Sequence, residues 1–354
     1  MESIKLLERL SLAFGPSGYE YEISEIMTGE LKNKTKVKKD RLGSIIFEKK
    51  GSNTEPRIML AAHMDEVGFI IQNITKKGFL RFYPIGGWVS QTLPGQRIII
   101  KGKKGYVEGI IGSTPPHFLK KKEENKKMEI EDMLIDIGAK SDKQVKELFG
   151  IEIGSFATPS PYFSKMKNPH LFMGKAFDNR IGCALIINLF HRMEKESHPN
   201  TLFGAGTVQE EVGLRGAKTV AEYVKPDMAI VLEAPPADDF PGITKDKPQG
   251  ALGGGVQIRC FDPTMIGNVK LKELVIETAE KNRIKYQLAV RTGGGTDAGA
   301  IHISGIGVPT IVFGIPVRYT HSHIGMMNTE DYNSALKLLF KFLKRLNKET
   351  VAKL

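Results

Sequence analysis

The sequence predicts an α/β fold, in which a sheet flanked by helices is interrupted by a small inserted β domain. Helical and strand-like patterns alternate from about residue 166 onward, and similar patterns occupy the first 66 residues. This alternation is typical of a sheet with helices packed on it. Between these parts, residues 67–162 consist of short β-rich segments separated by glycines, which is typical of a small barrel-like domain. The 354 residues suffice for one large and one smaller domain.

The first part of the chain contains two helical patterns and one buried strand. Residues 4–14 and 19–32 have helical patterns, and the turn sequence GPSG at 15–18 separates them. Arg57–Ala62 (RIMLAA) is a short and nearly continuous apolar run, as expected for a strand buried on both faces. We assign residues 1–66 to a discontinuous α/β domain, which continues over residues 163–354.

The inserted part differs from the rest of the chain in its pattern of apolar residues and glycines. Its short segments read GFIIQNI, GFLRFYPI, QRIIIKG and GYVEGIIG, each with a glycine at an end. One short helix is predicted at Ser141–Phe149. We therefore predict that residues 67–162 form an inserted β-barrel-like domain.

The second α/β part alternates regularly between helices and strands. Its predicted elements are a helix at Asn179–Arg192, a strand at Thr201–Val208, a helix at Arg215–Val224, a strand at Met228–Leu232 and a strand at Pro309–Gly314. A last helix is predicted at about Thr329–Asn347, because its large apolar residues fall on one stripe.

Composition limits the partners of the protein. The net charge is +11, but the lysines are spread along the chain, and the densest run, Lys120–Lys127, also contains Glu123 and Glu124. The run has no interleaved aromatic residues and belongs to no recognisable binding module, so we interpret it as a solvated surface loop. We therefore expect no nucleic-acid partner.

The sequence carries no sign of membrane insertion or secretion. No stretch approaches 18 uninterrupted apolar residues, so we expect no membrane span and no membrane partner. The amino-terminal segment is a charged amphipathic helix pattern without the features of a signal peptide, which predicts a cytoplasmic location. Cys183 and Cys260 lie in apolar segments, where we expect small buried thiols instead of a disulfide.

Histidine and acidic residues gather at the ends of predicted strands. They are His63 and Asp65 after the first strand, Glu210 and Glu211 after the second, Glu233 after the third, Asp178 just before a helix, and His321 after the last strand. Because ligands bind at the carboxyl ends of the strands in open α/β sheets, we expect these side chains to lie close together.

Such a cluster predicts a metal centre. Carboxylates brought close together repel one another unless cations neutralise them, and a mixture of histidine and carboxylate ligands suits zinc, cobalt or manganese. Taken singly, each residue has an ordinary interpretation, such as a helix N-cap for Asp178 or a solvated helix start for Glu210 and Glu211. The repeated placement of these residue types at strand ends favours the metal centre.

Eight motifs along the chain resemble those of one known family. They are GPSGYE at 15–20, HMDEVGF at 63–69, PPH at 115–117, IDIGA at 135–139, FDNR at 177–180, QEEVG at 209–213, GGTDA at 294–298 and RYTHS at 318–322. Together they resemble the tetrahedral (TET) aminopeptidases, a metallopeptidase family that includes glutamyl aminopeptidases and proteins called endoglucanases. The resemblance implies an α/β metallopeptidase sheet with an inserted PDZ-like dimerisation domain.

The resemblance also implies a role for each ligand. Asp178 would bridge two divalent metal ions in each subunit. His63 and Glu233 would complete the site of one ion, and Glu211 and His321 that of the other. Zinc or cobalt is expected, and manganese also suits these ligands.

Two further acidic residues receive roles from the resemblance. Asp65 would orient His63, and Glu210 would be the general base. Two departures stand out: relatives often have aspartate in the place of Glu233, and relatives often carry a proline in the segment after His321, where this chain has His323-Ile324-Gly325. Either acid can ligate, so we retain Glu233 as a ligand, and we do not assign His323.

The expected activity is removal of amino-terminal residues from peptides. A metal-bound hydroxide would attack the peptide carbonyl, and Glu210 would take a proton and return it to the leaving amine. The resemblance further implies self-association into dimers and a hollow tetrahedral dodecamer. The preferred amino-terminal residue and the role of His117 stay open at this stage.

Two alternatives have different requirements. A glycosidase, as the endoglucanase names suggest, needs two carboxylates but no metal cluster, which leaves His63 and His321 unexplained. A catalytically inactive binding scaffold has no need of Glu210. Both alternatives are therefore less favoured than a two-metal aminopeptidase.

Overall fold

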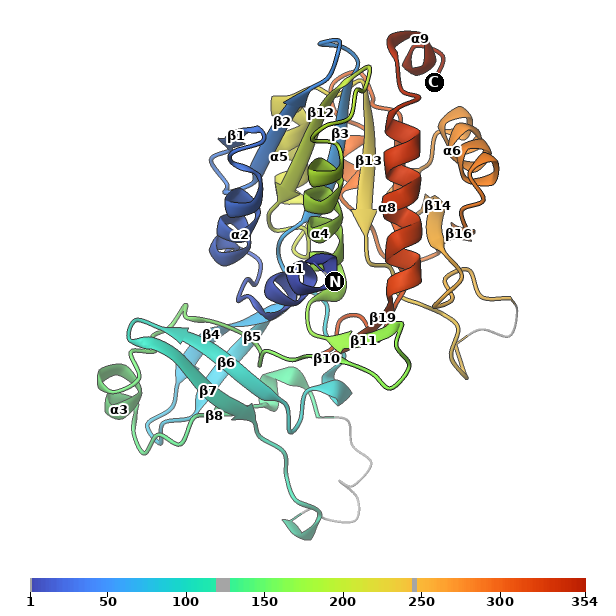
Figure 1. Cartoon of the computed structure of the whole chain (residues 1–354). Helices are drawn as coiled ribbons and strands as arrows, with labels where there is room; N and C mark the ends of the chain where they lie inside the picture. Colours follow the sequence, from blue (N-terminus) through green and yellow to red (C-terminus); the bar gives the residue numbers. More distant parts are fainter. Residues whose placement is uncertain (1, 119–127, 244–246) are drawn as a thin grey trace.

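The computed structural model describes residues 2–118, 128–243 and 247–354 (Figure 1). The lysine run at 120–127 lies outside these residues. Across the described helices, none is long and apolar enough to cross a membrane. The structure has an α/β part and a separate β-barrel, which lies below the α/β part in Figure 1.

A mixed sheet forms the centre of the α/β part. In spatial order its main strands are β1 (Lys36–Lys39), β2 (Ile45–Lys50), β12 (Thr201–Thr207), β3 (Arg57–His63), β13 (Met228–Glu233), β17 (Thr310–Gly314), β14 (Val256–Asp262) and β15 (Met265–Ile266), and β16 (Tyr286–Val290) also pairs with β14. The four central strands, from β12 to β17, run parallel. Their carboxyl ends therefore share one edge of the sheet.

Helices cover both faces of this sheet (Figure 1). On one face lie α1 (Glu2–Leu12), α2 (Tyr21–Leu31), α4 (Phe177–Arg192), α6 (Val269–Lys281) and α8 (Thr329–Leu343). On the other lie α5 (Arg215–Val224) and α7 (Ala298–Ile301). Successive residues of β3 alternate between the two cores: Leu60 packs with the first group of helices and Ala61 with the second. This alternation follows from the two-residue period of a strand, and it explains why the strand is apolar from Ile58 to Ala62.

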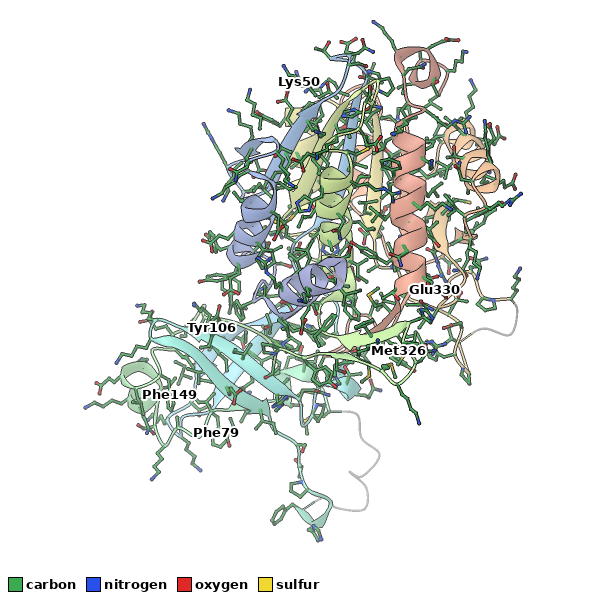
Figure 2. All side chains as sticks on the ribbon, in the orientation of Figure 1. Lys50, Phe79, Tyr106, Phe149, Met326 and Glu330 are labelled. Atoms are coloured by element: carbon green, nitrogen blue, oxygen red, sulfur yellow. The ribbon has the colours of Figure 1, made fainter. Side chains whose placement is uncertain are left out.

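The β-rich segments form a closed barrel with its own apolar core. Around the barrel the strands are β4 (Gly68–Ile74), β5 (Leu80–Ile85), β8 (Ile135–Asp136), β7 (Gly105–Ile111), β6 (Arg97–Gly102) and β9 (Phe156–Pro159). The short helix α3 (Asp142–Glu147) lies at the expected place, because the Ser141 side chain accepts a hydrogen bond from the Gln144 amide and caps it. Tyr106 lies where the barrel meets the α/β part (Figure 2), and its hydroxyl contacts the Glu22 carboxylate.

A smaller sheet lies near the carboxyl ends of the central strands (Figure 1). Its strands, in spatial order, are β10 (Phe163–Lys165), β11 (Leu171–Gly174), β19 (Gly325–Asn328) and β18 (Val317–Arg318). Together with three single-turn 3₁₀ helices at Ser90–Thr92, Pro116–Phe118 and Ile130–Asp132 and the short α9 (Lys348–Val351), these elements complete the described structure. The mixed α/β fold expected from the sequence is confirmed.

Several predicted helix boundaries were wrong by a few residues. The first helix ends at Leu12 instead of residue 14, because the buried Arg180 guanidinium takes the carbonyls of Leu10 and Ala13 as acceptors. The last helix ends at Leu343 instead of Asn347. Asn347 instead caps α9 through the Thr350 amide. Cys183 is buried as predicted, whereas Cys260 is only partly buried, and both thiols are free.

Candidate metal centre

The parallel strands bring the predicted ligands to one edge of the sheet. His63 is the last residue of β3 and Glu233 the last of β13. Glu210 and Glu211 follow β12 by three and four residues. The register places Thr207 of β12 beside His63. The side chains therefore converge because parallel neighbours end together.

Asp178 and His321 reach the same place from outside the sheet. Asp178 lies at the start of α4, where its φ and ψ of −83° and 106° are not helical. His321 lies in the loop between β18 and β19, with a left-handed φ of 56°. The structure thus brings together the seven residues that the sequence analysis singled out.

The two oxygens of Asp178 face two different histidines. Oδ1 lies 3.2 Å from His63 Nε2, and Oδ2 lies 3.7 Å from His321 Nε2. Glu233 Oε2 lies 3.7 Å from His63 Nε2, and Glu211 Oε2 lies 3.5 Å from His321 Nε2. Asp178 therefore stands between two groups, each with one further carboxylate and one histidine.

Glu210 lies on the His63 side of the site. Its Oε2 atom is 3.9 Å from His63 Nε2. Ligand-type atoms of His63, Glu210 and Glu233 lie within 4.8 Å of one another, as do those of His63, Asp178 and Glu211. Distance alone therefore does not distinguish a ligand from a base at Glu210.

Backbone carbonyls orient both imidazoles. His63 Nδ1 lies 3.1 Å from the carbonyl oxygen of Asp65 and 3.5 Å from its carboxylate. His321 Nδ1 lies 2.9 Å from the carbonyl oxygen of Gly87, in the segment after β5. A carbonyl at Nδ1 requires a donated hydrogen there, which leaves Nε2 of each neutral ring free to bind a cation.

Burial of so many acids in one place changes their protonation. Burial raises the pKa of Glu211 to about 7 and that of Glu233 to about 8, with nearby carboxylates adding to the effect. Burial likewise raises the pKa of Glu210 well above its ordinary value. Burial alone would lower the pKa of His63, but the surrounding carboxylates raise it well above its ordinary value. Without added positive charge, the site therefore retains protons near neutral pH.

These residues fit divalent cations by their chemistry. Two imidazoles and several carboxylates are the donor set that zinc and related ions prefer. Glu233 Oε1 is buried without a hydrogen-bond partner among the described residues, which costs free energy unless something binds it. Cations at this place would neutralise the crowded carboxylates and satisfy that oxygen.

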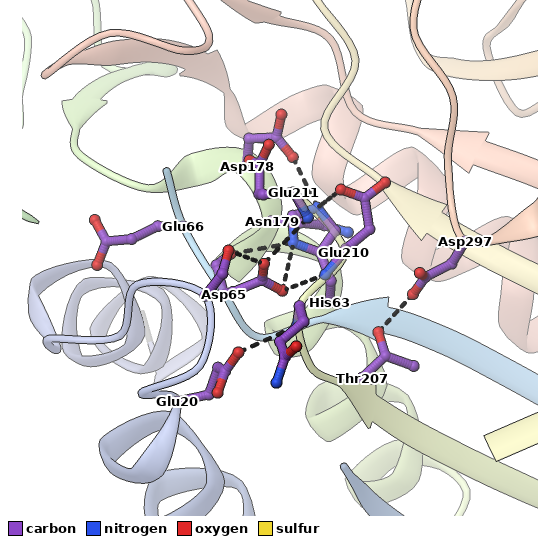
Figure 3. A network of polar contacts seen from close by, with 12 residues as sticks. Glu20, His63, Asp65, Glu66, Asp178, Asn179, Thr207, Glu210, Glu211 and Asp297 are labelled. Carbon is purple, nitrogen blue, oxygen red and sulfur yellow. Dashed lines mark hydrogen bonds and ion pairs between the residues drawn. The ribbon is translucent and has the colours of Figure 1, made fainter. Parts of the chain in front are cut away.

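Two carboxylates hold the backbone that carries Glu210 and Glu211 (Figure 3). The amides of Glu210 and Glu211 donate to the Asp65 carboxylate, both at 3.1 Å. The preceding amide, that of Gln209, donates to Glu20 at 3.1 Å. Asp65 is fully buried, and Ser17 donates its hydroxyl to Asp65 at 2.6 Å. Asp65 therefore contacts His63 and positions the two glutamates as well.

The site opens into a cavity of about 860 Å³. His63, Asp178, Glu210, Glu211, Glu233 and His321 all line it. Its wall also includes Arg259, Arg291 and the glycine-rich segment 293–295. A cavity of this size admits part of a peptide next to the ligand cluster.

Comparison with known proteins agrees with this arrangement. The family model of the M42 glutamyl aminopeptidases matches residues 43–338, which is most of the chain. The chain belongs to this M42 family. Membership makes it a peptide hydrolase of the aminopeptidase type and implies divalent metal ions. The resemblance drawn from the eight motifs is confirmed, and the glycosidase alternative is set aside.

Three relatives of this M42 chain illustrate the likeness. The TET aminopeptidase of a marine sediment archaeon of the Thaumarchaeota is 45% identical, covers 99% of this chain and 98% of its own, and superposes with a TM-score of 0.96. The TET1 peptidase of Pyrococcus horikoshii, which can assemble into a tetrahedron or a large octahedral shell, is 33% identical with a TM-score of 0.87, covering 97% of this chain and all of its own. The glutamyl aminopeptidase of Lactococcus lactis is 37% identical over 89% of this chain and 88% of its own.

Some residues near the M42 site were not singled out from the sequence. Arg259 is 5% exposed in the middle of β14, and a buried arginine in an apolar strand is a signal that was available. Glu20 lies within the GPSGYE motif, but its partner Gln209 is 189 residues away, so the contact itself was not predictable. His117 is exposed in a 3₁₀ turn, and the structure assigns it no contact with the site.

Proposed function

We propose that this chain is a two-metal aminopeptidase that removes amino-terminal residues from peptides, with Glu210 as its general base. The arrangement of Asp178, whose two carboxylate oxygens face the two histidines at 3.2 and 3.7 Å, supports this proposal most directly. Asp178 would bridge the ions, with His63 and Glu233 at one and Glu211 and His321 at the other. Zinc or cobalt suits these ligands best, and manganese is also compatible.

The residues around the proposed ions have separate roles in the reaction. Two divalent cations held there would lower the pKa of a shared water towards about 7 and polarise the peptide carbonyl. Glu210, partly buried beside His63, accepts the proton of the attacking water and returns it to the leaving amine. Asp65 keeps Glu210 in place through the Glu210 amide. The free α-amine of a peptide, in its neutral form, would bind at one of the ions, which would restrict cleavage to the first bond.

Peptide products test this function directly. A free peptide should lose single residues in order from its amino end, and the same peptide with an acetylated amino group should be cleaved much more slowly. Mass spectrometry of both reactions measures the products. A chelator should stop the reaction and added zinc or cobalt should restore it. Dominant cleavage inside the peptide, or full activity in the chelator, would contradict the proposal.

The cavity wall favours an acidic first residue. Arg259 and Arg291 both line the cavity, so each brings a positive charge to its wall. Asp262 holds the Arg259 guanidinium, and Asp238 and the Pro236 carbonyl hold that of Arg291. Both guanidinium groups keep unused N–H donors on their Nη atoms. A carboxylate side chain of the substrate would accept from them, and a charge-assisted hydrogen bond contributes about 1.5–3 kcal/mol.

Chromogenic substrates test this preference. We expect kcat/KM for a glutamyl substrate to exceed that for a leucyl or lysyl substrate, and Arg259→Gln or Arg291→Gln to reduce this ratio by about 10- to 100-fold. The exposed Arg41 offers a matched control, and Arg41→Gln should leave the ratio unchanged. An unchanged ratio in both cavity variants would remove the arginines from substrate selection.

We also propose that residues 67–162 form a PDZ-like dimerisation domain and that the chain assembles into dimers and a tetrahedral dodecamer. Support comes from the closed barrel and from the assembly of the related Pyrococcus horikoshii peptidase. In such an assembly the active sites would face an inner chamber, which excludes folded proteins. The cytoplasmic location stays a prediction from the sequence.

A further inference from the structure

The turn that carries Glu210 and Glu211 is held by three consecutive amides. After β12 ends at Thr207, the amides of Gln209, Glu210 and Glu211 all donate to carboxylates at 3.1 Å. Asp65 takes two of them and Glu20 takes the third. Consecutive amides that point to one side form an anion-binding concavity, and here the anions belong to the protein itself.

Glu20 serves this turn instead of its own helix. Glu20 occupies the N-cap position of α2, yet its side chain makes no capping hydrogen bond there. Glutamate is not among the favoured N-cap residues. Its Oε1 accepts instead from the Gly18 amide at 2.7 Å and from the Gln209 amide at 3.1 Å. Glu20 is only 6% exposed, so little water can reach these bonds.

Gln209 needs such support because of its backbone. It has a φ of 56°, in the left-handed region that non-glycine residues seldom adopt. Such a conformation persists where the surroundings hold it. Gln209 comes directly before the two glutamates, so a change of its backbone would redirect both carboxylates.

We propose that Glu20 is a positioning residue: by holding the Gln209 amide, it sets the places of the Glu210 and Glu211 carboxylates at the metal centre. This inference rests on the proposed function. Glu20 touches neither substrate nor ligand atoms and acts through the turn. The loop at 15–20 thereby couples twice to the site, through Ser17 on Asp65 and through Glu20 on Gln209.

Three variants separate positioning from general stability. Glu20→Ala removes the acceptor, whereas Glu20→Gln keeps an oxygen that can accept from the same amides. Glu22→Ala is the matched control, because Glu22 lies two residues further on and contacts the Phe14 amide and the Tyr106 hydroxyl. Among the described residues, no hydrogen bond or ion pair joins Glu22 to residues 209–211, so loss of the Glu22 carboxylate should lower stability without moving the turn.

Hydrogen exchange measures the turn without reference to activity. By mass spectrometry of peptides covering residues 208–214, Glu20→Ala should exchange faster than the parent, whereas Glu20→Gln and Glu22→Ala should match it. Unchanged exchange in Glu20→Ala would overturn the proposal. This measurement needs neither substrate nor metal, so it fails or succeeds independently of the proposed function.

Kinetics and metal binding complete the test. In Glu20→Ala we expect kcat to fall by at least about 10-fold with KM nearly constant, because small displacements of catalytic groups are costly. We expect zinc affinity, measured by competition with a chelating dye, to fall by about 10- to 100-fold, as for other residues that orient ligands. Glu20→Gln should recover both within a few-fold. A lower melting temperature with parental kcat and zinc affinity would show a purely structural role and refute the proposal.

Discussion

The different roles of Glu210 and Glu211 can be separated by one matched pair of substitutions. Glutamine keeps the size and polarity of glutamate but accepts no proton at neutral pH. Glu210 Oε2 lies 3.9 Å from His63 Nε2, and Glu211 Oε2 lies 3.5 Å from His321 Nε2. If Glu210 is the base, Glu210→Gln should lower kcat by about 10²–10⁴, which corresponds to about 3–5 kcal/mol of activation free energy. Its metal content should match that of the parent.

Glu211→Gln should lose activity for a different reason, which is weaker metal binding. Losing a ligand carboxylate weakens one of the two proposed sites, so the purified variant should hold less metal than the parent. Excess zinc or cobalt should restore part of its turnover, whereas excess metal should not help Glu210→Gln. Glu222 on α5 is exposed, so Glu222→Gln provides the same chemical change far from the site and should behave as the parent does.

The assay compares metal stoichiometry by elemental analysis with turnover, for each variant, with and without added metal. Loss of metal from Glu210→Gln together with retention in Glu211→Gln would reverse the two roles. The short distances among His63, Glu210 and Glu233 make this reversal a real alternative. Unchanged turnover in both variants would show that the catalytic centre lies elsewhere.

Two further predictions concern protons and assembly. In the metal-free chain, burial raises the pKa of Glu211 from 4.5 to about 7 and that of Glu233 from 4.5 to about 8. Between the ordinary and the raised pKa of each glutamate, the folded chain binds more protons than the unfolded chain. The free energy of unfolding therefore falls as pH rises through this interval. In a chelator the melting temperature should therefore be lower at pH 8 than at pH 5.5, and zinc affinity should rise over the same interval as the ligands lose protons; equal melting temperatures would contradict the assignment. Sedimentation should show dimers and larger assemblies, and a strictly monomeric active enzyme would refute the proposed assembly.

Much of the fold was predictable because buried helices and strands have a regular pattern of apolar residues in the sequence. The strand at 57–62 is apolar from Ile58 to Ala62 because both of its faces contact a core, and the abrupt change to His63 marks its end. Glu233 ends β13 in the same way. The convergence of such residues could be expected from parallel strands alone. Their roles at the metals stay proposals.

Other elements have a weaker pattern of apolar residues in the sequence. The strand β1 reads KVKK and is mostly exposed, so its pairing with β2 leaves no apolar alternation to detect. Strands β14 and β16 at the far side of the sheet were also not predicted. The sequence predicted that α4 starts at Asn179, whereas the helix starts at Phe177, and Asp178 and Asn179 have non-helical backbone angles within it. The contacts of Glu20 and Gly87 join residues far apart in sequence, so only the folded chain reveals them.

The Gly87 carbonyl has a consequence for protein engineering. It comes from the segment that follows a barrel strand, yet it fixes His321 in the loop after β18. A Cβ at position 87 would lie 3.1 Å from His321 Nδ1, so even alanine would crowd the ring. The barrel therefore cannot be exchanged freely between relatives. A chimera that carries the barrel of a relative must keep a glycine at the position of Gly87, because otherwise the His321 ring would lose its orientation.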